Sequence, residues 1–354
     1  MTYRVIQWST GNVGRYALRG IINHPELELV GVWAHSKEKA GLDAGELCGL
    51  PPTGVKVSND ADELLALDAD VVSYNSTGDL RPVEAIDDIV RIMGSGKNVV
   101  GTALVPLVYP PSAPAEMRQP LEEACLKNNV SCFMSGIDPG VANDLLPLVL
   151  TGLAERIDSV RVQEILNYAT YDQAEVLFHT MGFAHPLDHT PVLLIPGVLA
   201  LAWGCVVNVI AAGLGVELDE VREQVVEKIP APETFEVPSG TVEKGTMAAI
   251  RFEIQGIVGG EPRIVVEHVT RLREDLAPHW PAPPGKGGYR VLVEGSPKLT
   301  VTLELEGDGG DENSGGLIVT AMRLLNAIPA VVQAPPGLLS ALDLPLVTGR
   351  GLMR

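Results

Sequence analysis

The groups of this chain that could do chemistry begin with a glycine-bearing turn near the amino end, Ser9-Thr10-Gly11-Asn12-Val13-Gly14. The turn has the spacing of the dinucleotide fingerprint G-x-G-x-x-G, with serine at the first glycine position. Gly11 would let the backbone approach phosphate oxygens, Gly14 would let a helix pack closely on a strand, and Arg15 adds a cation. Because a helix start also presents free N–H groups, the turn predicts a pyrophosphate site.

The elements around this turn are those that a dinucleotide site requires. Tyr3 to Trp8 is predicted to be a strand, Arg15 to Asn23 a helix, and Leu27 to Trp33 a second strand. In the alternative interpretation the glycines only shape a strand-to-helix turn. The strand, helix, strand order favours the dinucleotide.

The residues after the second strand bear on which dinucleotide is bound. An NAD site usually places Asp or Glu about 20 residues past the glycines, to bind the ribose 2′-hydroxyl. This region instead contains His35, Ser36 and Lys37, which favour a 2′-phosphate. We therefore expect NADP in preference to NAD. The alternative is a solvated turn in which Glu38 swings in toward the ribose of NAD.

Strands and helices continue to alternate up to residue 136. Strands are predicted at Asp70 to Tyr74, Asn98 to Thr102 and Val130 to Ser135, with helices between them. This alternation predicts a parallel, doubly wound sheet, in which ligands gather at the carboxyl ends of the strands. The remaining cofactor contacts expected at those ends are Asn75, Ser76, Thr77, Thr102 and Ala103.

The pattern changes after residue 138. Asn143 to Arg156 is predicted to be a helix and Val160 to Tyr168 a strand, while short strands separated by Gly and Pro turns run from 235 to 305. We predict an α/β protein with a Rossmann-type domain in residues 1–140, completed by 315–354, with regular structure ending at Pro335. A second α+β domain, 141–314, would hold a largely antiparallel open sheet for substrate binding and dimerisation.

Composition narrows the classes of function. The net charge of −19 and the pI near 4.7 argue against nucleic acid and anionic membrane surfaces. The apolar run from Val192 to Leu214 is long enough to span a bilayer, but it lacks flanking cations, so a buried helix is favoured. The four cysteines have no metal-ligand spacing, and neither a metal site nor a signal peptide is expected. We expect reduced thiols and a cytoplasmic protein.

Hydride transfer to or from a nicotinamide also needs a group that moves a proton. Glu164 and Tyr168 lie four residues apart on one predicted strand and so share a face. Asp138 follows the last parallel strand, and Asn143 begins the next helix. These four are the predicted catalytic or substrate-site residues. In the alternative interpretations Asp138 and Asn143 are caps, Glu164 faces solvent and Tyr168 is a core aromatic.

Several segments resemble a known family. Val5 to Gly14 and Gly136-Ile137-Asp138-Pro139-Gly140 resemble the N-terminal domain of dihydrodipicolinate reductases. Asp144 to Pro147, Asn326 to Ala330 and Ala334 to Gly337 extend the resemblance to 2,4-diaminopentanoate dehydrogenases and native amine dehydrogenases. The resemblance implies oxidative deamination of an amine with NAD(P)+, or reductive amination of a ketone or aldehyde in reverse. It also implies that Asn326 binds the nicotinamide carboxamide.

The chain departs from this family at one position that matters. Amine dehydrogenases of the group carry Thr-Cys-Glu-Glu after the fifth strand, whereas this chain has Thr102-Ala103-Leu104-Val105-Pro106 and lacks the acid. The paired-histidine motif of dihydrodipicolinate reductases is also missing, so lysine biosynthesis is disfavoured. We expect a homodimer acting on a small hydrophobic amine or ketone. The alternatives are a reductase of C=C or C=O bonds, which would tolerate the missing acid, and a non-catalytic NADP-binding sensor.

Overall fold

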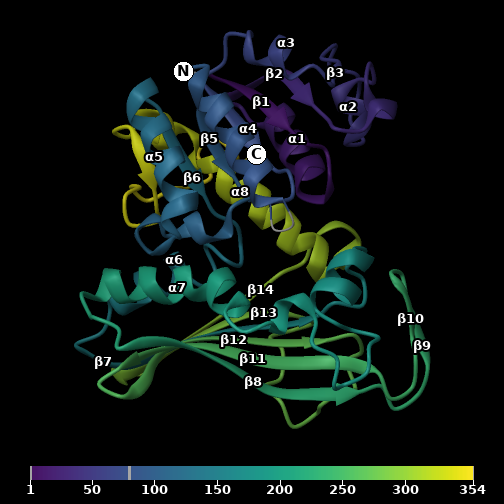
Figure 1. Ribbon diagram of the computed structural model, residues 1–354, viewed down its shortest axis with the longest axis vertical. Helices are drawn as coiled ribbons and strands as arrows, with labels where there is room; N and C mark the ends of the chain where they lie inside the picture. Colours follow the sequence, from purple (N-terminus) through teal and green to yellow (C-terminus); the bar gives the residue numbers. More distant parts are fainter. Residues whose placement is uncertain (1, 79–80, 354) are drawn as a thin grey trace. The chain divides into compact units, whose positions relative to one another are not determined.

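Seven parallel strands form the sheet that carries the predicted dinucleotide site (Figure 1). Their order is β15-β6-β5-β4-β1-β2-β3, and the order reverses between β1 and β4, where a doubly wound sheet opens its ligand crevice. The strands are β1 (Tyr3–Trp8), β2 (Leu27–Trp33), β3 (Val57–Ser58), β4 (Val71–Tyr74), β5 (Asn98–Gly101), β6 (Ser131–Met134) and β15 (Gly337–Leu339).

The computed structural model describes residues 2–78 and 81–353, which fold as two compact units. The first unit comprises the chain up to Val141 and again from Leu317, and the second comprises Ala142–Gly316. The helices of the first unit are α1 (Asn12–Asn23), α2 (Ala44–Leu47), α3 (Ala61–Leu65), α4 (Pro82–Gly94), α5 (Ala115–Asn128) and the part of α8 (Glu312–Gln333) from Leu317 onward.

Helices cover both faces of the first sheet because its strand residues alternate between two cores. Ile6 and Trp8 pack with Ile89 of α4 and Leu121 of α5 in one core. Val5, on the opposite face of β1, belongs to the second core, which includes α8 residues. The predicted α/β class, with a doubly wound parallel sheet, is confirmed.

The larger differences from the sequence prediction in this unit concern α1, the chain after Pro335 and α8. Helix α1 begins at Asn12 rather than Arg15, because Gly11 already serves as its N-cap. A short strand, β15, follows Pro335 and Pro336, where regular structure was expected to end, and it pairs with β6. Helix α8 continues to Gln333 rather than Ala327 and includes Pro329.

Helix α8 is long and apolar enough to cross a membrane by length and composition alone. Its Leu324, Leu325 and Ile328 are fully buried against the first sheet. These contacts are those of a core helix, which satisfies the same length and hydropathy test.

The second unit contains a six-stranded mixed sheet of order β14-β13-β7-β12-β11-β8. Strands β7 and β12 pair in parallel, and the other neighbours are antiparallel. The strands are β7 (Arg156–Asn167), β8 (Glu220–Pro230), β11 (Met247–Val258), β12 (Glu261–Arg271), β13 (Gly288–Ser296) and β14 (Leu299–Glu304), beside a hairpin of β9 (Phe235–Val237) and β10 (Gly240–Val242).

The helix predicted from Asn143 to Arg156 is too long at both ends. Helix α6 covers only Leu145–Thr151, Gly152 ends it, and Arg156 already begins β7. Strand β8 was not predicted, because charged residues occupy both faces of this edge strand. The apolar run is also divided, since Pro196 and Gly197 separate a 3-10 turn, Val192–Leu194, from α7 (Val198–Leu214).

Helix α7 lies over one face of the second sheet (Figure 1). Its first turn is held by Glu223 of β8, whose carboxylate oxygens accept from the backbone N–H groups of Gly197 at 2.9 Å and Ala200 at 2.6 Å. A carboxylate at this end also favours the helix dipole. The anchored helix carries Trp203, whose ring lies 4.4 Å from that of His268 on β12.

Candidate active site

The turn between β1 and α1 has the geometry of a phosphate-binding turn despite its missing glycine. Ser9 adopts a φ of +81°, in the left-handed region that glycine usually supplies. A Cβ at Gly14 would lie 2.4 Å from the Ser9 carbonyl oxygen, so only glycine allows this approach of helix and turn. At Gly11 the nearest atom to an added Cβ would be Ser9 Oγ at 3.9 Å, which leaves open space for a ligand.

The start of α1 is suited to an anion. Gly11 is the N-cap and provides no side-chain cap, and the first turn contains no acidic residue. The backbone N–H groups of this turn therefore remain available to a phosphate, together with the positive end of the helix dipole. Arg15 is exposed and lies over the ring of Tyr16, with its Cζ 4.8 Å from the ring centroid.

The loop after β2 is tied to this turn by a lysine that the sequence prediction missed. Lys39 Nζ donates to the carbonyl oxygen of Thr10 at 3.1 Å and to its hydroxyl at 2.9 Å. Asn59 holds the other side of the loop by donating to the Ser36 carbonyl at 3.1 Å. His35 and Lys37 are exposed on this tethered loop. Lys39 was missed because spacing alone does not indicate which neighbouring lysine turns back to the glycines.

At the point where the strand order reverses, Gln7 of β1 meets the end of β4. Its Nε2 donates to the Ser9 carbonyl at 2.8 Å and to Asn75 Oδ1 at 3.0 Å, and Ser73 Oγ donates to the same Oδ1 at 3.0 Å. Gln7 is fully buried, and sequence reasoning missed it. The available signal was a polar amide between the apolar residues Ile6 and Trp8 of a doubly covered strand.

The other residues predicted to bind the cofactor lie in two places, the ends of β4 and β5 and a hollow beside α8. Ser76 and Thr77 follow Asn75, and the Thr102 backbone N–H donates to the Tyr74 carbonyl at 3.2 Å, so the ends of β4 and β5 are adjacent. Ala103 is buried directly after Thr102. Asn326 instead lines a hollow of about 280 Å³ with His24 and Glu26, which follow the far end of α1. The structure does not bring Asn326 to the phosphate turn.

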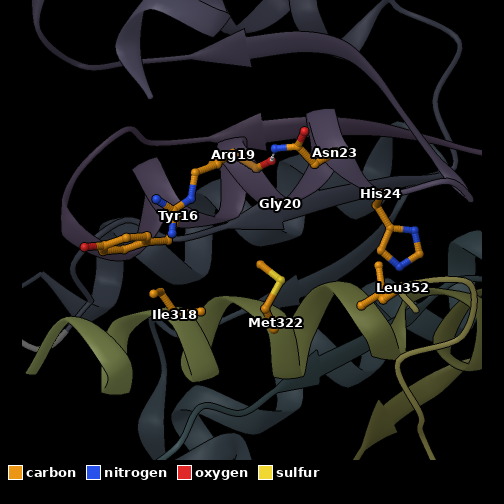
Figure 2. A pocket seen from close by; sticks show the side chains of 8 residues that line it. All are labelled: Tyr16, Arg19, Gly20, Asn23, His24, Ile318, Met322 and Leu352. Atoms are coloured by element: carbon orange, nitrogen blue, oxygen red, sulfur yellow. Dashed lines mark hydrogen bonds between the residues drawn. The ribbon is translucent and has the colours of Figure 1, made fainter. Parts of the chain in front are cut away.

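A second hollow, of about 270 Å³, lies between α1 and α8 (Figure 2). Tyr16, Arg19 and His24 face Met322 and its neighbours across it. The hollow is lined by the side of α1 and not by its first residues, so it is separate from the turn at Ser9 to Gly14. Leu104 and Leu107, which follow Thr102 and Ala103 in the chain, are buried in the core beneath α4 and α5.

In the second unit, Glu164 and Tyr168 are in contact, together with two residues that the sequence did not indicate. Tyr168 Oη donates to Glu164 Oε1 at 2.7 Å, and Tyr289 Oη donates to Oε2 at 2.7 Å. His268 Nδ1 lies 3.3 Å from Oε1. Glu164 is paired in register with both His268 and Tyr289, so one rung of the sheet places the three side chains on one face.

This carboxylate is buried, with Glu164 only 4% exposed. Burial raises the pKa of Glu164, but the charge of His268 and the hydrogen bonds from Tyr289 and Tyr168 outweigh it, and the pKa lies below its ordinary value. His268 is itself stacked on Phe252, with ring centroids 4.8 Å apart. The solvent-facing interpretation of Glu164 is therefore wrong, and the site holds an ionised carboxylate at neutral pH.

The other two predicted residues are Asp138 and Asn143. Asp138 lies in the turn after β6 in the first unit, next to Ile137, whose N–H donates to Thr320 Oγ1 at 3.1 Å. Asn143 is fully buried at the start of the second unit. The N-cap of α6 is Asp144 and not Asn143, so the capping interpretation of Asn143 is wrong.

Comparisons with known proteins decide the family. Residues 141–353 match the model of the 2,4-diaminopentanoate dehydrogenase C-terminal domain, and residues 5–74 match that of the dihydrodipicolinate reductase N-terminus. The chain belongs to the 2,4-diaminopentanoate dehydrogenase family. The resemblance inferred from the residues at positions 5–14, 136–147 and 326–337 is thereby confirmed.

Relatives of the 2,4-diaminopentanoate dehydrogenase family extend over nearly the whole chain. The amine dehydrogenase of Streptomyces virginiae is 44% identical over 344 residues, which is 96% of each protein. The 2,4-diaminopentanoate dehydrogenase of Acetoanaerobium sticklandii is 25% identical over 74% of this chain and 70% of its own length. The structure of an amine dehydrogenase from Mycobacterium smegmatis shares the fold, with a TM-score of 0.77 at 21% identity over 98% of this chain and 97% of that one.

The Tyr289→Phe variant tests the hydrogen bonds around Glu164. Losing this donor should lower the free energy of unfolding at pH 7 by about 1.5–3 kcal/mol, the usual range for a hydrogen bond to a charged group. Because the pKa of Glu164 is lowered by folding, its stabilising contribution is present above its ordinary pKa and is lost as the pH falls through the lowered value. Urea unfolding should therefore show a smaller difference in acid than at pH 7. An equal difference at both would contradict an ionised Glu164.

Proposed function

We propose that this chain oxidises a small hydrophobic amine with NADP+, and that it catalyses the reductive amination of the matching ketone or aldehyde in reverse. As a member of its family, it is a nicotinamide-dependent oxidoreductase that acts on the CH–NH2 group. The uncapped start of α1, with open space beside Gly11, carries the proposal, because it can accept the pyrophosphate of such a coenzyme.

The reaction requires one hydride and one proton to leave the substrate. The ammonium form of the amine first loses a proton, and a hydride then leaves its carbon to give an iminium ion. Water adds to the iminium carbon, its protons pass to the nitrogen, and ammonium departs as the carbonyl forms. The bound coenzyme supplies the hydride acceptor. The chain must hold the amine, accept its proton and limit the access of water.

We propose that Glu164 accepts the proton of the amine. It would take the place of the acid that is missing after Thr102. Tyr168 Oη, at 2.7 Å from Glu164 Oε1, would pass the proton from the substrate nitrogen. The lowered pKa keeps Glu164 ionised and able to accept it. Asp138 and Asn143 remain proposed substrate-site residues. The rings of Trp203 and Phe252 beside His268 favour an apolar substituent on the amine.

The Glu164→Gln variant tests this assignment. Removing the proton acceptor should reduce kcat/KM for amine oxidation by about tenfold or more, since general base catalysis is typically worth at least that factor. The wild type should stay active into mildly acidic pH, while the variant loses the acid limb of its pH profile. Glu236→Gln, on the exposed part of β9, is the matched control and should retain full activity.

The same assay separates the alternatives. NADPH oxidation by a ketone or aldehyde panel should depend on ammonia. Turnover without ammonia would instead favour a reductase of C=O or C=C bonds. Tight NADPH binding with no turnover on any amine or ketone would favour a sensor.

We further propose a preference for NADP over NAD. Ser36 and the exposed His35 and Lys37 lie on the loop that Lys39 and Asn59 fix beside the phosphate turn. A 2′-phosphate would gain charge-assisted hydrogen bonds there. Glu38 follows Lys37. Its carboxylate would repel the 2′-phosphate only if the Glu38 side chain, and not that of Lys37, pointed toward the ribose.

Two lysine variants give different expected results for the two coenzymes. Lys37→Ala should raise the Kd for NADP+ by about tenfold and leave the Kd for NAD+ unchanged, because only NADP+ carries the 2′-phosphate. Lys39→Ala should raise the Kd for both coenzymes, since Lys39 holds Thr10 rather than the ribose. Calorimetric titration measures the four values. A wild-type preference for NAD+ of tenfold or more would overturn the proposal.

We also propose that the chain works in the cytoplasm as a homodimer, formed through the face of the second sheet opposite α7. This face holds a fixed polar network in which Glu267 accepts from Arg161 at 2.6 Å, Arg251 at 2.6 Å and Gln163 at 2.9 Å. Such a network is already organised before association, so a second copy would lose little side-chain entropy on binding.

The Thr302→Arg variant tests this dimer face. Thr302 is exposed on β14 and is paired with Arg290, so an added arginine places like charges together on the proposed interface without entering a core. Sedimentation velocity should show a dimeric wild type and a shift toward monomer in the variant. Thr348→Arg, at an exposed position of the first unit, should stay dimeric. Equal behaviour of both variants would exclude this face.

A further inference from the structure

Buried polar atoms gather at the carboxyl edge of the first sheet. Within the described part of the chain, five such atoms without a hydrogen-bond partner lie at or directly after strand ends: Gln7 Oε1, Trp8 Nε1, Trp33 Nε1, Asn75 Nδ2 and Ser135 Oγ. A buried donor or acceptor left unpaired is costly, so such groups in a native protein call for a partner. In a doubly wound sheet, this edge is where a bound molecule would supply the partners.

The orientation of one of these groups is fixed by its neighbours. Asn75 Oδ1 accepts from both Gln7 Nε2 and Ser73 Oγ, each at 3.0 Å. Two donors on one side of the amide determine which end is oxygen, and the Nδ2 group must therefore face the other way. Asn75 is 8% exposed, so this NH2 group is held in a largely buried position.

Gln7 joins this amide to the phosphate turn. Its Nε2 also donates, at 2.8 Å, to the carbonyl oxygen of Ser9, the residue with a φ of +81°. One buried amide thus connects the turn after β1 with the end of β4, the two strands that flank the point where the strand order reverses. Gln7 Oε1 remains as an unpaired acceptor and Asn75 Nδ2 as an unpaired donor, on two side-chain amides that are hydrogen-bonded to each other.

We propose that Gln7 is a positioning residue for the coenzyme, which directs the Asn75 amide toward the ribose that carries the nicotinamide. The inference rests on the proposed function and assigns a further role within the same site. A ribose hydroxyl both accepts and donates, so it matches the Nδ2 donor and the Oε1 acceptor together. A phosphate oxygen only accepts, and it would leave Gln7 Oε1 facing negative charge.

The test measures binding to the free chain rather than turnover. Gln7→Met removes the amide at similar volume, and Asn75→Asp keeps the acceptor for Gln7 and Ser73 but loses the donor. Each should raise the Kd for NADPH by about tenfold, and the double variant should be little weaker than either single one, because both disrupt one contact. Energy transfer from tryptophan to NADPH reports binding, since Trp8 and Trp33 are stacked at this edge with ring centroids 4.8 Å apart.

A fragment of the coenzyme locates the effect. Adenosine 2′,5′-bisphosphate lacks the nicotinamide ribose, so its Kd should change less than about threefold in the same variants. An equal loss for fragment and coenzyme would overturn the assignment to that ribose. If Gln7→Met does not fold, Ser73→Ala serves in its place, because it removes one of the two donors to Asn75 Oδ1. It should raise the Kd for NADPH by about threefold.

A matched control separates positioning from general stability. Gln333 also donates a hydrogen bond from its side-chain amide within the first unit. The acceptor is Tyr3 Oη, at 2.8 Å, at the start of β1. Gln333→Met should lower Tm without changing the NADPH Kd. A Gln7→Met variant that lowers Tm and leaves the Kd within about twofold would show a purely structural role and reject the inference. A wild-type chain that binds neither coenzyme would instead reject the proposed function.

Discussion

The contact between Ser9 and Gly14 is the constraint on which the nucleotide site depends. The carbonyl of Ser9 lies where a single methyl group on residue 14 would stand, so strand β1 and helix α1 meet with no side chain between them. The turn reaches this position only with Ser9 in a left-handed conformation, which disfavours most residues. Gln7 and Lys39 then hold the turn from two sides, through Ser9 and Thr10. A strained turn persists when its surroundings fix it in this way.

The second unit solves a different problem, which is how to keep a carboxylate charged inside a sheet. Burying Glu164 would by itself favour the neutral acid. Strand register supplies the compensation, because the residues paired with Glu164 on both sides carry groups that stabilise the anion. Glu267 on the opposite face follows the same rule, since burial raises its pKa while Gln163, Arg161 and Arg251 lower it to a net value below normal. Each face of the sheet thus carries its own stabilised anion.

The sequence predicted what depends on local pattern. Apolar runs such as Tyr3–Trp8 and Met247–Val258 were recognised with their observed bounds, and the alternation of strands and helices indicated the doubly wound sheet. The pairing of Glu164 with Tyr168 was also foreseeable, because four residues along one strand share a face. The edge strand β8 was not foreseen, because charges on both of its faces hide the alternation that marks a half-buried strand.

What could not be predicted depends on register between distant segments. His268 and Tyr289 lie more than 100 residues from Glu164 in the chain, and only the pairing of β12 and β13 with β7 brings them to it. Gln7 and Asn75 meet for the same reason, across β1 and β4. For Asn326, which the resemblance assigned to the carboxamide, the structure shows only that it lines a hollow near the far end of α1.

The division of the chain into a continuous unit and an interrupted one has a consequence for its synthesis. The second unit, Ala142–Gly316, is complete as soon as its last residue leaves the ribosome. The first unit begins earlier but finishes later, because α8 fills one of its cores and β15 pairs with β6. The nascent chain up to Val141 therefore emerges with one core incomplete and with the β6 edge of its sheet unpaired, until α8 and β15 have been synthesised.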